Sequence, residues 1–295
     1  MAHASNSVET VLGKKNANQL GRTLTHEHLS LNFATFYVQP PGHLKRFLDG
    51  KIELRNVGML KQYPYSNPYN LIYNDQCTED AILEDVRLYK EFGGGTIVEN
   101  SNYGLQRNIP FMKKVSQATG INVIAGTGYY VSATQTKEDL LKEDMYDVML
   151  KEMTIGCEEY PDVKTGFIGE VGSTWPITRT IPRPEDLLQF ADDAKCYCQF
   201  DLFGCECSFY QLNPSVDMIS DAQRIDRVKY FRNDQKLDRV LLSHDIHTKH
   251  RLMKFGGHGF SHILNNVVPK MTLKGFTSEE IDTLTIHNPR AWLTC

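Results

Sequence analysis

The sequence predicts an α/β fold: a TIM-type (β/α)8 barrel that is incomplete, with about six strand–helix units in place of eight. Short apolar segments alternate along the chain with segments of helical character, and this alternation indicates parallel strands joined by helices. The apolar segments contain few polar positions, as is typical of strands buried on both faces. A chain of 295 residues has the length of one α/β barrel, so we expect a single domain over residues 1–295.

Six strands and six helices are expected in alternation. The strands are expected at 23–29, 96–101, 122–130, 166–172, 196–204 and 239–246. The helices are expected at 78–92, 107–119, 137–156, 184–195, 221–233 and 278–292. Thr78 and Ser278 are each followed by two acidic residues, which favour the N-terminus of a helix.

The alternation breaks after the fourth expected strand. A short segment rich in Pro, Arg and Thr follows it and ends at Pro184. Since one unit of a ~250-residue barrel has about 30 residues, two units of roughly 60 residues are absent. We therefore expect an internal deletion near 177–186.

Composition argues against a nucleic-acid-binding, secreted or membrane-spanning protein. The net charge is −4 and the pI is about 6.2, with lysine and arginine scattered, whereas nucleic-acid binding usually requires a basic face. The N-terminus lacks the basic and apolar pattern of a secretory signal, and no apolar window reaches the roughly 18 residues of a membrane span. Seven cysteines without a signal peptide favour reduced thiols. We expect a cytoplasmic protein that acts on a small molecule, without nucleic acid or membrane, and of open oligomeric state.

Polar side chains mark the ends of the expected strands. In barrels of this kind the functional groups lie at the C-terminal strand ends. The polar residues there are His26, His28, Glu99, Asn100, Tyr129, Tyr130, Glu170, Asp201 and Asp245. Strands that simply run into polar loops are the alternative, but that explains histidine and carboxylate at so many ends less well.

Four of these residues have the chemistry of a metal site. Side chains alternate along a strand, so His26 and His28 face the same way and can hold one divalent cation. Glu170 and Asp245 each end an apolar strand, where a carboxylate is costly to bury unless it is paired or bound to metal. A chance pair of histidines, or a loop carboxylate, remains the alternative for each motif taken alone.

Several motifs together resemble the phosphotriesterase-related proteins of the amidohydrolase superfamily. They are Thr-His-Glu-His at 25–28, Gly-Glu-Val-Gly at 169–172, Asp-Leu-Phe-Gly at 201–204, His-Asp-Ile-His-Thr-Lys at 244–249, Arg-Leu-Met-Lys-Phe-Gly-Gly-His-Gly at 251–259 and Asn-Asn-Val-Val-Pro-Lys at 265–270. The resemblance extends from about residue 8 to residue 294.

The resemblance implies a metal-dependent hydrolase with two divalent cations per subunit. By analogy, His26 and His28 hold one metal, Glu170 bridges both, and Asp245 binds the first metal and takes the proton of an activated hydroxide. Zinc is the metal expected first, with manganese, iron and cobalt as alternatives. The implied reaction is amide hydrolysis of small N-acetylated amino acids or sulfonates, of the N-acetyltaurine type. An esterase, lactonase or phosphotriesterase is the alternative.

The sequence departs from this family pattern at the second metal. Relatives have two further histidines, on the fifth and sixth strands, but this sequence has none from 44 to 243. We therefore expect at most one tightly bound metal and a catalytically impaired or inactive chain. Three further residues are candidates for contact with substrate: Tyr129, His247 and Arg251.

Overall fold

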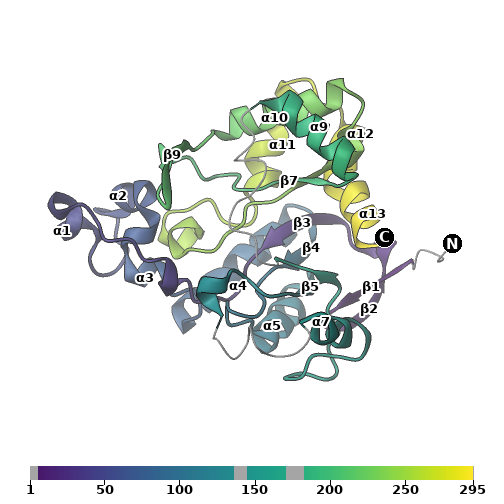
Figure 1. The fold of residues 1–295 in the computed structure, drawn as a ribbon, viewed down its shortest axis with the longest axis horizontal. Coiled ribbons are helices and arrows are strands. Elements are labelled where there is room, and N and C mark those ends of the chain that lie inside the picture. The colour runs from purple at the N-terminus through teal and green to yellow at the C-terminus, as the bar shows by residue number, and fades with distance from the viewer. Residues whose placement is uncertain (1–5, 136–144, 171–182, 295) are drawn as a thin grey trace.

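The computed structural model describes residues 6–135, 145–170 and 183–294 and has an α/β fold (Figure 1). Its parallel strands form the wall of a barrel. They are β3 (Arg22–Glu27), β4 (Gly94–Glu99), β5 (Asn122–Thr127), β6 (Phe167–Ile168), β7 (Cys198–Phe200) and β10 (Val240–Leu242). All six expected strands are present, generally shorter than expected, and residues 171–172 of the fourth lie outside the described residues.

The strands form one continuous arc. Strands β3, β4, β5 and β6 are hydrogen-bonded in that order, and β7 pairs with β10. Strand β10 lies beside β3, because the Asp245 N–H donates to the His26 carbonyl at 3.1 Å and Thr25 Oγ1 donates to the Leu242 carbonyl at 3.1 Å. Over the described part of the chain no ladder joins β6 to β7. The prediction of an incomplete TIM-type barrel with about six units is thus confirmed.

Helices cover the outside of the arc (Figure 1). The longer ones are α4 (Gln76–Glu91), α5 (Ile109–Thr119), α7 (Met145–Thr154), α9 (Pro184–Ala194) and α10 (Asp221–Asn233). Shorter ones are α1 (Lys45–Leu48), α2 (Val57–Gln62), α3 (Pro68–Leu71), α11 (Val268–Leu273), α12 (Ser278–Asp282) and α13 (Asn288–Leu293). Helices α1 to α3 belong to the long connection between β3 and β4, which projects at the left of Figure 1.

Two helices differ from the expectation for a physical reason. Helix α4 begins before Thr78, because Asp75 is the N-cap and its carboxylate accepts the Thr78 N–H at 2.9 Å. The expected helix 278–292 is divided into α12 and α13 by a π-helical turn, Thr283–His287. Pro289 follows that turn and has no N–H for an α-helical hydrogen bond, which favours the interruption.

Two antiparallel hairpins were not expected. Strands β1 (Ser7–Thr10) and β2 (Gly13–Asn16) form the first, and β8 (Phe209–Tyr210) and β9 (Asn213–Asp217) form the second. The first hairpin lies at the N-terminal end of the strands, where the Val11 N–H donates to the Val123 carbonyl at 2.9 Å. A small buried apolar cluster fills this base of the barrel: Val8, Ala17, Leu20, Val98, Ile124 and Phe167. Because this cluster closes the N-terminal end of the strands, we expect the functional residues at their C-terminal end.

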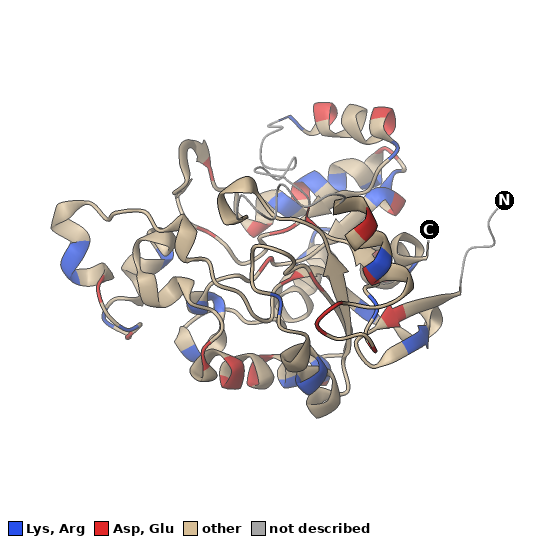
Figure 2. Ribbon diagram, turned by 60° about the horizontal axis from the view of Figure 1, so that its bottom comes forward, with Lys and Arg blue, Asp and Glu red and all other residues tan. Residues whose placement is uncertain are grey.

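Acidic and basic residues are interspersed along the helices (Figure 2). No helix in the described residues is long and apolar enough to cross a membrane.

A buried carboxyl on α4 predicts an unusual pH dependence of stability. Asp85 is 2% exposed, and its Oδ2 accepts the Met253 N–H at 3.1 Å. Burial raises its pKa to about 7, although that N–H opposes the shift. Because the folded pKa is above the unfolded value of about 3.9, the unfolded chain binds fewer protons between pH 4 and 7, and stability falls as pH rises through that range.

Asp85→Asn is therefore expected to raise the free energy of unfolding by ~2 kcal/mol or more at pH 8 and by little at pH 4. Urea unfolding at both pH values measures this. Asp80→Asn, at an exposed position of the same helix, serves as the control. An unchanged slope of stability against pH in Asp85→Asn would contradict the prediction.

Candidate metal centre

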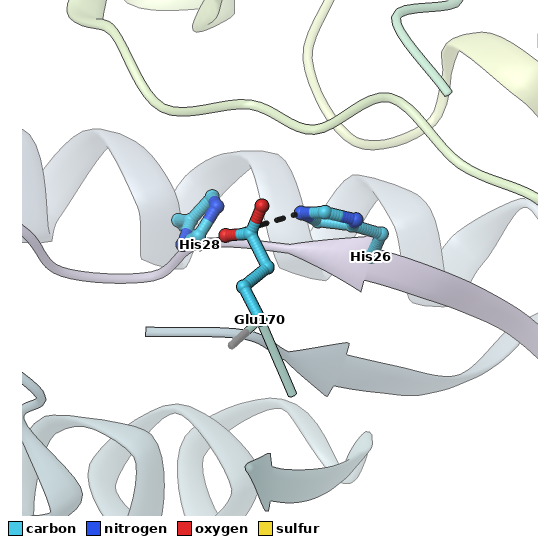
Figure 3. A group of neighbouring side chains, drawn as sticks. All are labelled: His26, His28 and Glu170. Carbon is cyan, nitrogen blue, oxygen red and sulfur yellow. Dashed lines mark ion pairs between the residues drawn. The ribbon is translucent and has the colours of Figure 1, made fainter. Parts of the chain in front are cut away.

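The end of strand β3 presents two histidines to the inside of the barrel. The His26 and His28 rings are 5.5 Å apart, and both side chains are largely buried, with 14% and 4% exposed. Glu170 follows β6, and its carboxylate lies between the two rings, with Oε2 3.9 Å from His26 Nε2 (Figure 3). The structure thus brings together three residues that are far apart in the sequence.

The four predicted metal ligands surround one point. His26, His28 and Glu170 each offer a ligand atom, and these atoms lie within 4.8 Å of one another. Asp245 Oδ1 is 3.7 Å from His26 Nε2 and 3.3 Å from His28 Nε2. Ligands bound tetrahedrally at about 2.1 Å are about 3.4 Å apart, so these spacings suit one small divalent cation.

An unsatisfied nitrogen supports the same interpretation. His26 Nε2 is buried and has no hydrogen-bond partner in the described part of the chain. A buried polar atom without a partner is costly unless something binds it. The residues present therefore fit a metal ion whose ligands would include His26 Nε2.

Neighbouring side chains orient both imidazoles. Ser101 Oγ lies 3.0 Å from His28 Nδ1, within hydrogen-bond distance, and His28 Nε2 faces Asp245 Oδ1 at 3.3 Å. Asp201 Oδ2 lies 3.9 Å from His26 Nδ1, at the end of β7, and leaves Nε2 facing the centre in the same way. Such outer contacts fix the tautomer of metal-binding histidines. The sequence marked Asp201 only as a strand-end carboxylate, and Ser101 carried no signal.

Asp245 is held in a strained backbone conformation. Its φ is +54°, in the left-handed region that non-glycine residues rarely adopt. Its N–H donates to the His26 carbonyl, and its own carbonyl accepts Arg251 Nη1 at 2.6 Å. Strain of this kind persists where the surroundings over-determine it and is typical of functional sites.

The centre has an excess of negative charge. Burial alone would lower the pKa of His26, but Asp245, Glu170 and Asp201 raise it to about 9. Burial also raises the pKa of Glu170 to about 7, against the opposing effect of His26. Burial raises the pKa of Asp245, but His247 and His26 outweigh it and hold that pKa well below the usual value. Three carboxylates with one protonated histidine form an environment that attracts a cation.

Two of the three predicted substrate contacts, His247 and Arg251, touch Asp245. His247 Nδ1 is 3.2 Å from Asp245 Oδ1, and its Nε2 is 3.0 Å from the Tyr65 hydroxyl, a residue that sequence reasoning missed. The Tyr129 side chain is buried and stacks on Tyr103 at 5.0 Å. Arg251 is buried and bound to backbone carbonyls. Their contact with a substrate stays a prediction.

Glu99 does not join the centre. Its carboxylate accepts the N–H groups of Leu29 at 3.0 Å and Ser101 at 3.1 Å. Its role is to hold the two strand ends that carry His28 and Ser101.

Comparisons with known proteins identify the family. A sequence model of the Phosphotriesterase family matches residues 6–184 and 180–293. The chain belongs to this family. A "Phosphotriesterase-related protein" of Aedes aegypti is 42% identical over 337 positions, covering 93% of this chain and 94% of the relative. One of Drosophila grimshawi is 40% identical over 345 positions, covering 97% and 98%.

Solved structures show the same fold. A resiniferatoxin-binding protein from Rhodobacter sphaeroides has a TM-score of 0.88 at 22% identity, covering 98% of this chain and 95% of that one. The phosphotriesterase homology protein from Escherichia coli, complexed with phosphate in its active site, has a TM-score of 0.69 at 22% identity, covering 93% and 99%. By its family the chain is a metal-dependent hydrolase, since this family is generally dependent on divalent metals and the His26–His28–Glu170 group is present.

The family relatives are longer than this chain. The alignment with the Drosophila grimshawi protein has 345 positions against 295 residues here, so at least 50 positions, the difference, hold no residue of this chain. The family model, moreover, matches in two blocks that meet at 180–184.

Proposed function

We propose that this chain hydrolyses small N-acetylated amino acids or sulfonates, of the N-acetyltaurine type, at a centre that holds one divalent metal ion. The observation that carries the proposal is the convergence of His26, His28, Glu170 and Asp245 around the unpartnered Nε2 of His26. Zinc is the proposed metal, with manganese, iron or cobalt as alternatives for this mixed histidine and carboxylate set.

The ligand count supports one metal in this chain where the family resemblance implies two. A second ion would need the two histidines that relatives have on the fifth and sixth strands, and the sequence has no histidine from 44 to 243. The two matched blocks and the longer alignments support an internal deletion near 177–186. The deletion and the loss of the second metal have one common explanation, the absence of two barrel units.

The residues of the centre have separate tasks. A bound cation would polarise the scissile carbonyl and lower the pKa of a water molecule. Asp245 Oδ1, whose pKa is low, is ionised at neutral pH and placed to accept the proton of that water. His247 Nδ1, 3.2 Å from the same oxygen, stabilises the charge and orients the carboxylate. The buried position of the centre limits the access of bulk water.

An esterase activity is the second candidate. Structural neighbours include a lactonase from Listeria monocytogenes and a mutant organophosphorus hydrolase from Deinococcus radiodurans. Esters and lactones place a carbonyl where an amide would, so the same centre suits them. We also propose a cytosolic location, because the six described cysteines are free thiols.

Metal content per folded chain tests the proposal. After equilibration with zinc, we expect one ion per chain in the wild type and none in the double variant His26→Asn/His28→Asn. His43→Asn, which changes an exposed histidine, should leave the ion in place. Two ions per chain would contradict the one-metal proposal, and no ion would contradict the metal-dependent reaction altogether.

Turnover of an N-acetylated amino acid, a lactone and a phosphotriester, measured side by side with zinc present, then tests the substrate. Amide turnover that a chelator abolishes and zinc restores supports the proposal. Turnover of the lactone or phosphotriester alone favours the second candidate.

A further inference from the structure

A second polar pocket lies between the loops that follow β7 and β10. Its volume is about 390 Å³, and it contains Gly204, Cys205 and Glu206 from one loop and His250, Arg251 and His258 from the other, with Lys61 at its edge. A smaller pocket shares Cys205, His250 and Arg251 with it and extends to His247, which contacts the metal centre. In barrels of this type, the loops after the last two strands frequently form an anion site.

The buried guanidinium of Arg251 is bound by neutral groups in the described part of the chain. Its residue is 3% exposed, and its guanidinium donates to the carbonyls of Asp245 at 2.6 Å and Phe203 at 2.9 Å and to His258 Nε2 at 3.2 Å. All three acceptors are neutral, because burial and then Arg251 itself lower the pKa of His258 well below its usual value. No carboxylate forms an ion pair with Arg251 in the described residues, and two of its five N–H groups donate no hydrogen bond to them.

The two carboxylates of the pocket, Asp221 and Glu206, accept hydrogen bonds from groups other than Arg251 and Lys61. Asp221 accepts the Gly204 N–H at 2.8 Å and Arg224 Nη1 at 3.1 Å, and its other oxygen lies 2.6 Å from His262 Nε2. Glu206 accepts the Asp221 N–H at 2.9 Å. Lys61 is exposed at the rim and forms no ion pair with any described residue. Among the described residues, Arg251 and Lys61 are thus cations of this pocket that form no ion pair, while the carboxylates of Glu206 and Asp221 also lie in its wall.

Glycines hold the pocket in shape. A side chain at Gly257 would come within 2.1 Å of the Arg251 backbone, and one at Gly204 within 2.4 Å of the His258 ring. The Gly259 N–H also donates to the Arg251 carbonyl at 2.9 Å. The loop is thus folded closely around the guanidinium before any ligand arrives, which reduces the entropy lost on binding.

We propose that this pocket binds a small oxoanion, of the carboxylate, sulfonate or phosphate type, between Arg251 and Lys61. A planar guanidinium with two available N–H groups suits a pair of oxyanion oxygens, and the lysine adds a second charge at the entrance. The anion is either free in solution or the anionic group of a bound substrate. The site does not depend on the metal or on hydrolysis.

Titration of metal-free protein tests the site. Inorganic phosphate, methanesulfonate and acetate are added at constant ionic strength against chloride, and binding is followed by calorimetry and by the shift in Tm. We expect saturable binding of at least one anion in the wild type, weakened about tenfold in Lys61→Met and further in Lys61→Glu. Lys254→Met, which changes an exposed lysine of the same loop outside the pocket, is the matched control and should bind as the wild type does.

Two results would overturn the proposal. One is the absence of saturable binding of all three anions. The other is binding that is lost in His26→Asn/His28→Asn but unchanged in Lys61→Met and Lys61→Glu, which would place the anion at the metal centre. Retained binding in His26→Asn/His28→Asn supports the pocket even where hydrolysis fails.

A kinetic comparison separates the two sources of the anion. If the anion belongs to the substrate, Lys61→Met raises KM for a substrate with an anionic tail and leaves KM for its uncharged analogue unchanged. If the pocket binds a free anion, both KM values stay unchanged while phosphate binding weakens. Both results support the site and differ only in its ligand.

Discussion

Replacing Glu27 with alanine is expected to destabilise the protein by roughly 3–5 kcal/mol, a large part of the typical stability of a domain. The Glu27 carboxylate is fully buried and accepts four hydrogen bonds from the end of β10. The donors are Ser243 Oγ at 2.7 Å, the His244 N–H at 2.8 Å, His244 Nδ1 at 2.7 Å and the Ile246 N–H at 3.0 Å. Chemical denaturation at pH 7 measures the loss.

The physical reason is the set of donors left behind. Without the carboxylate, four buried N–H and O–H groups lose their acceptor at once, and each unsatisfied group costs about 1–3 kcal/mol before relaxation. Burial alone would raise the pKa of Glu27, but the contacts with His244 and its neighbours outweigh it and lower that pKa. The carboxylate is thus ionised where it accepts these bonds.

Glu27→Gln separates packing from charge. The amide has the same shape, but its NH2 group would face backbone donors, so we expect an intermediate loss. Glu84→Ala, at an exposed position of α4, should change stability by less than about 0.5 kcal/mol. A loss in Glu27→Ala no larger than that in Glu84→Ala would show that β10 does not depend on this carboxylate.

Glu27 also links stability to the metal centre. Its four donors flank Asp245 on both sides, at 243, 244 and 246, and so hold the left-handed backbone of that proposed ligand in place. Alternation along β3 points His26 and His28 toward the candidate metal centre and Glu27 toward the neighbouring strand β10.

The sequence was sufficient to predict that His26, His28, Glu170 and Asp245 lie close together, because strand geometry decides that outcome. Alternation on β3 places His26 and His28 on one face, and the common direction of parallel strands brings Glu170 and Asp245 to the same end. These rules depend on the strand alone. The positions of these four side chains therefore follow from the strands, without knowledge of their other neighbours.

The residues that the sequence did not predict depend on tertiary contacts. Ser101 orients His28 only because the turn after β4 passes beside β3, and Tyr65 reaches His247 from the irregular connection between β3 and β4. Arg251, which the sequence predicts as a substrate contact, is buried and bound to backbone carbonyls of distant segments. Neither periodicity nor composition encodes such approaches between distant segments.

The helix boundaries show the same division. Helix α10 occupies the expected span 221–233, since Ser220 forms a capping box with Gln223. The split between α12 and α13 was not predicted, because apolar periodicity continues through it, although Pro289 is a local signal for the interruption. Periodicity alone therefore locates a helix but not a π-helical turn within it.

Restoring the absent barrel units is expected to have the largest effect on activity. The version to be made carries, near 177–186, the segment of the Aedes aegypti relative that has no counterpart in this chain. We expect two metal ions per chain in place of one, and turnover higher by roughly three orders of magnitude. A second cation contributes several kcal/mol of charge stabilisation, and each ~1.4 kcal/mol is a factor of ten in rate.

The restored version should also be more soluble. Two additional units would pair the strand edges of β6 and β7, between which the described residues show no ladder. Unpaired strand edges favour association between chains. Light scattering on heating, alongside metal content and turnover, follows this second effect.

A matched control separates the effect of the second metal ion from the effect of closing the barrel. The same restored version with asparagine in place of the two histidines of the inserted segment should recover solubility without the second ion and without the full gain in turnover. If the short chain already turns over substrate within about threefold of the restored one, the second metal is not needed, and residues of this chain must supply its charge. If both restored versions gain turnover equally, closure of the barrel, and not the second ion, limits activity in the short chain.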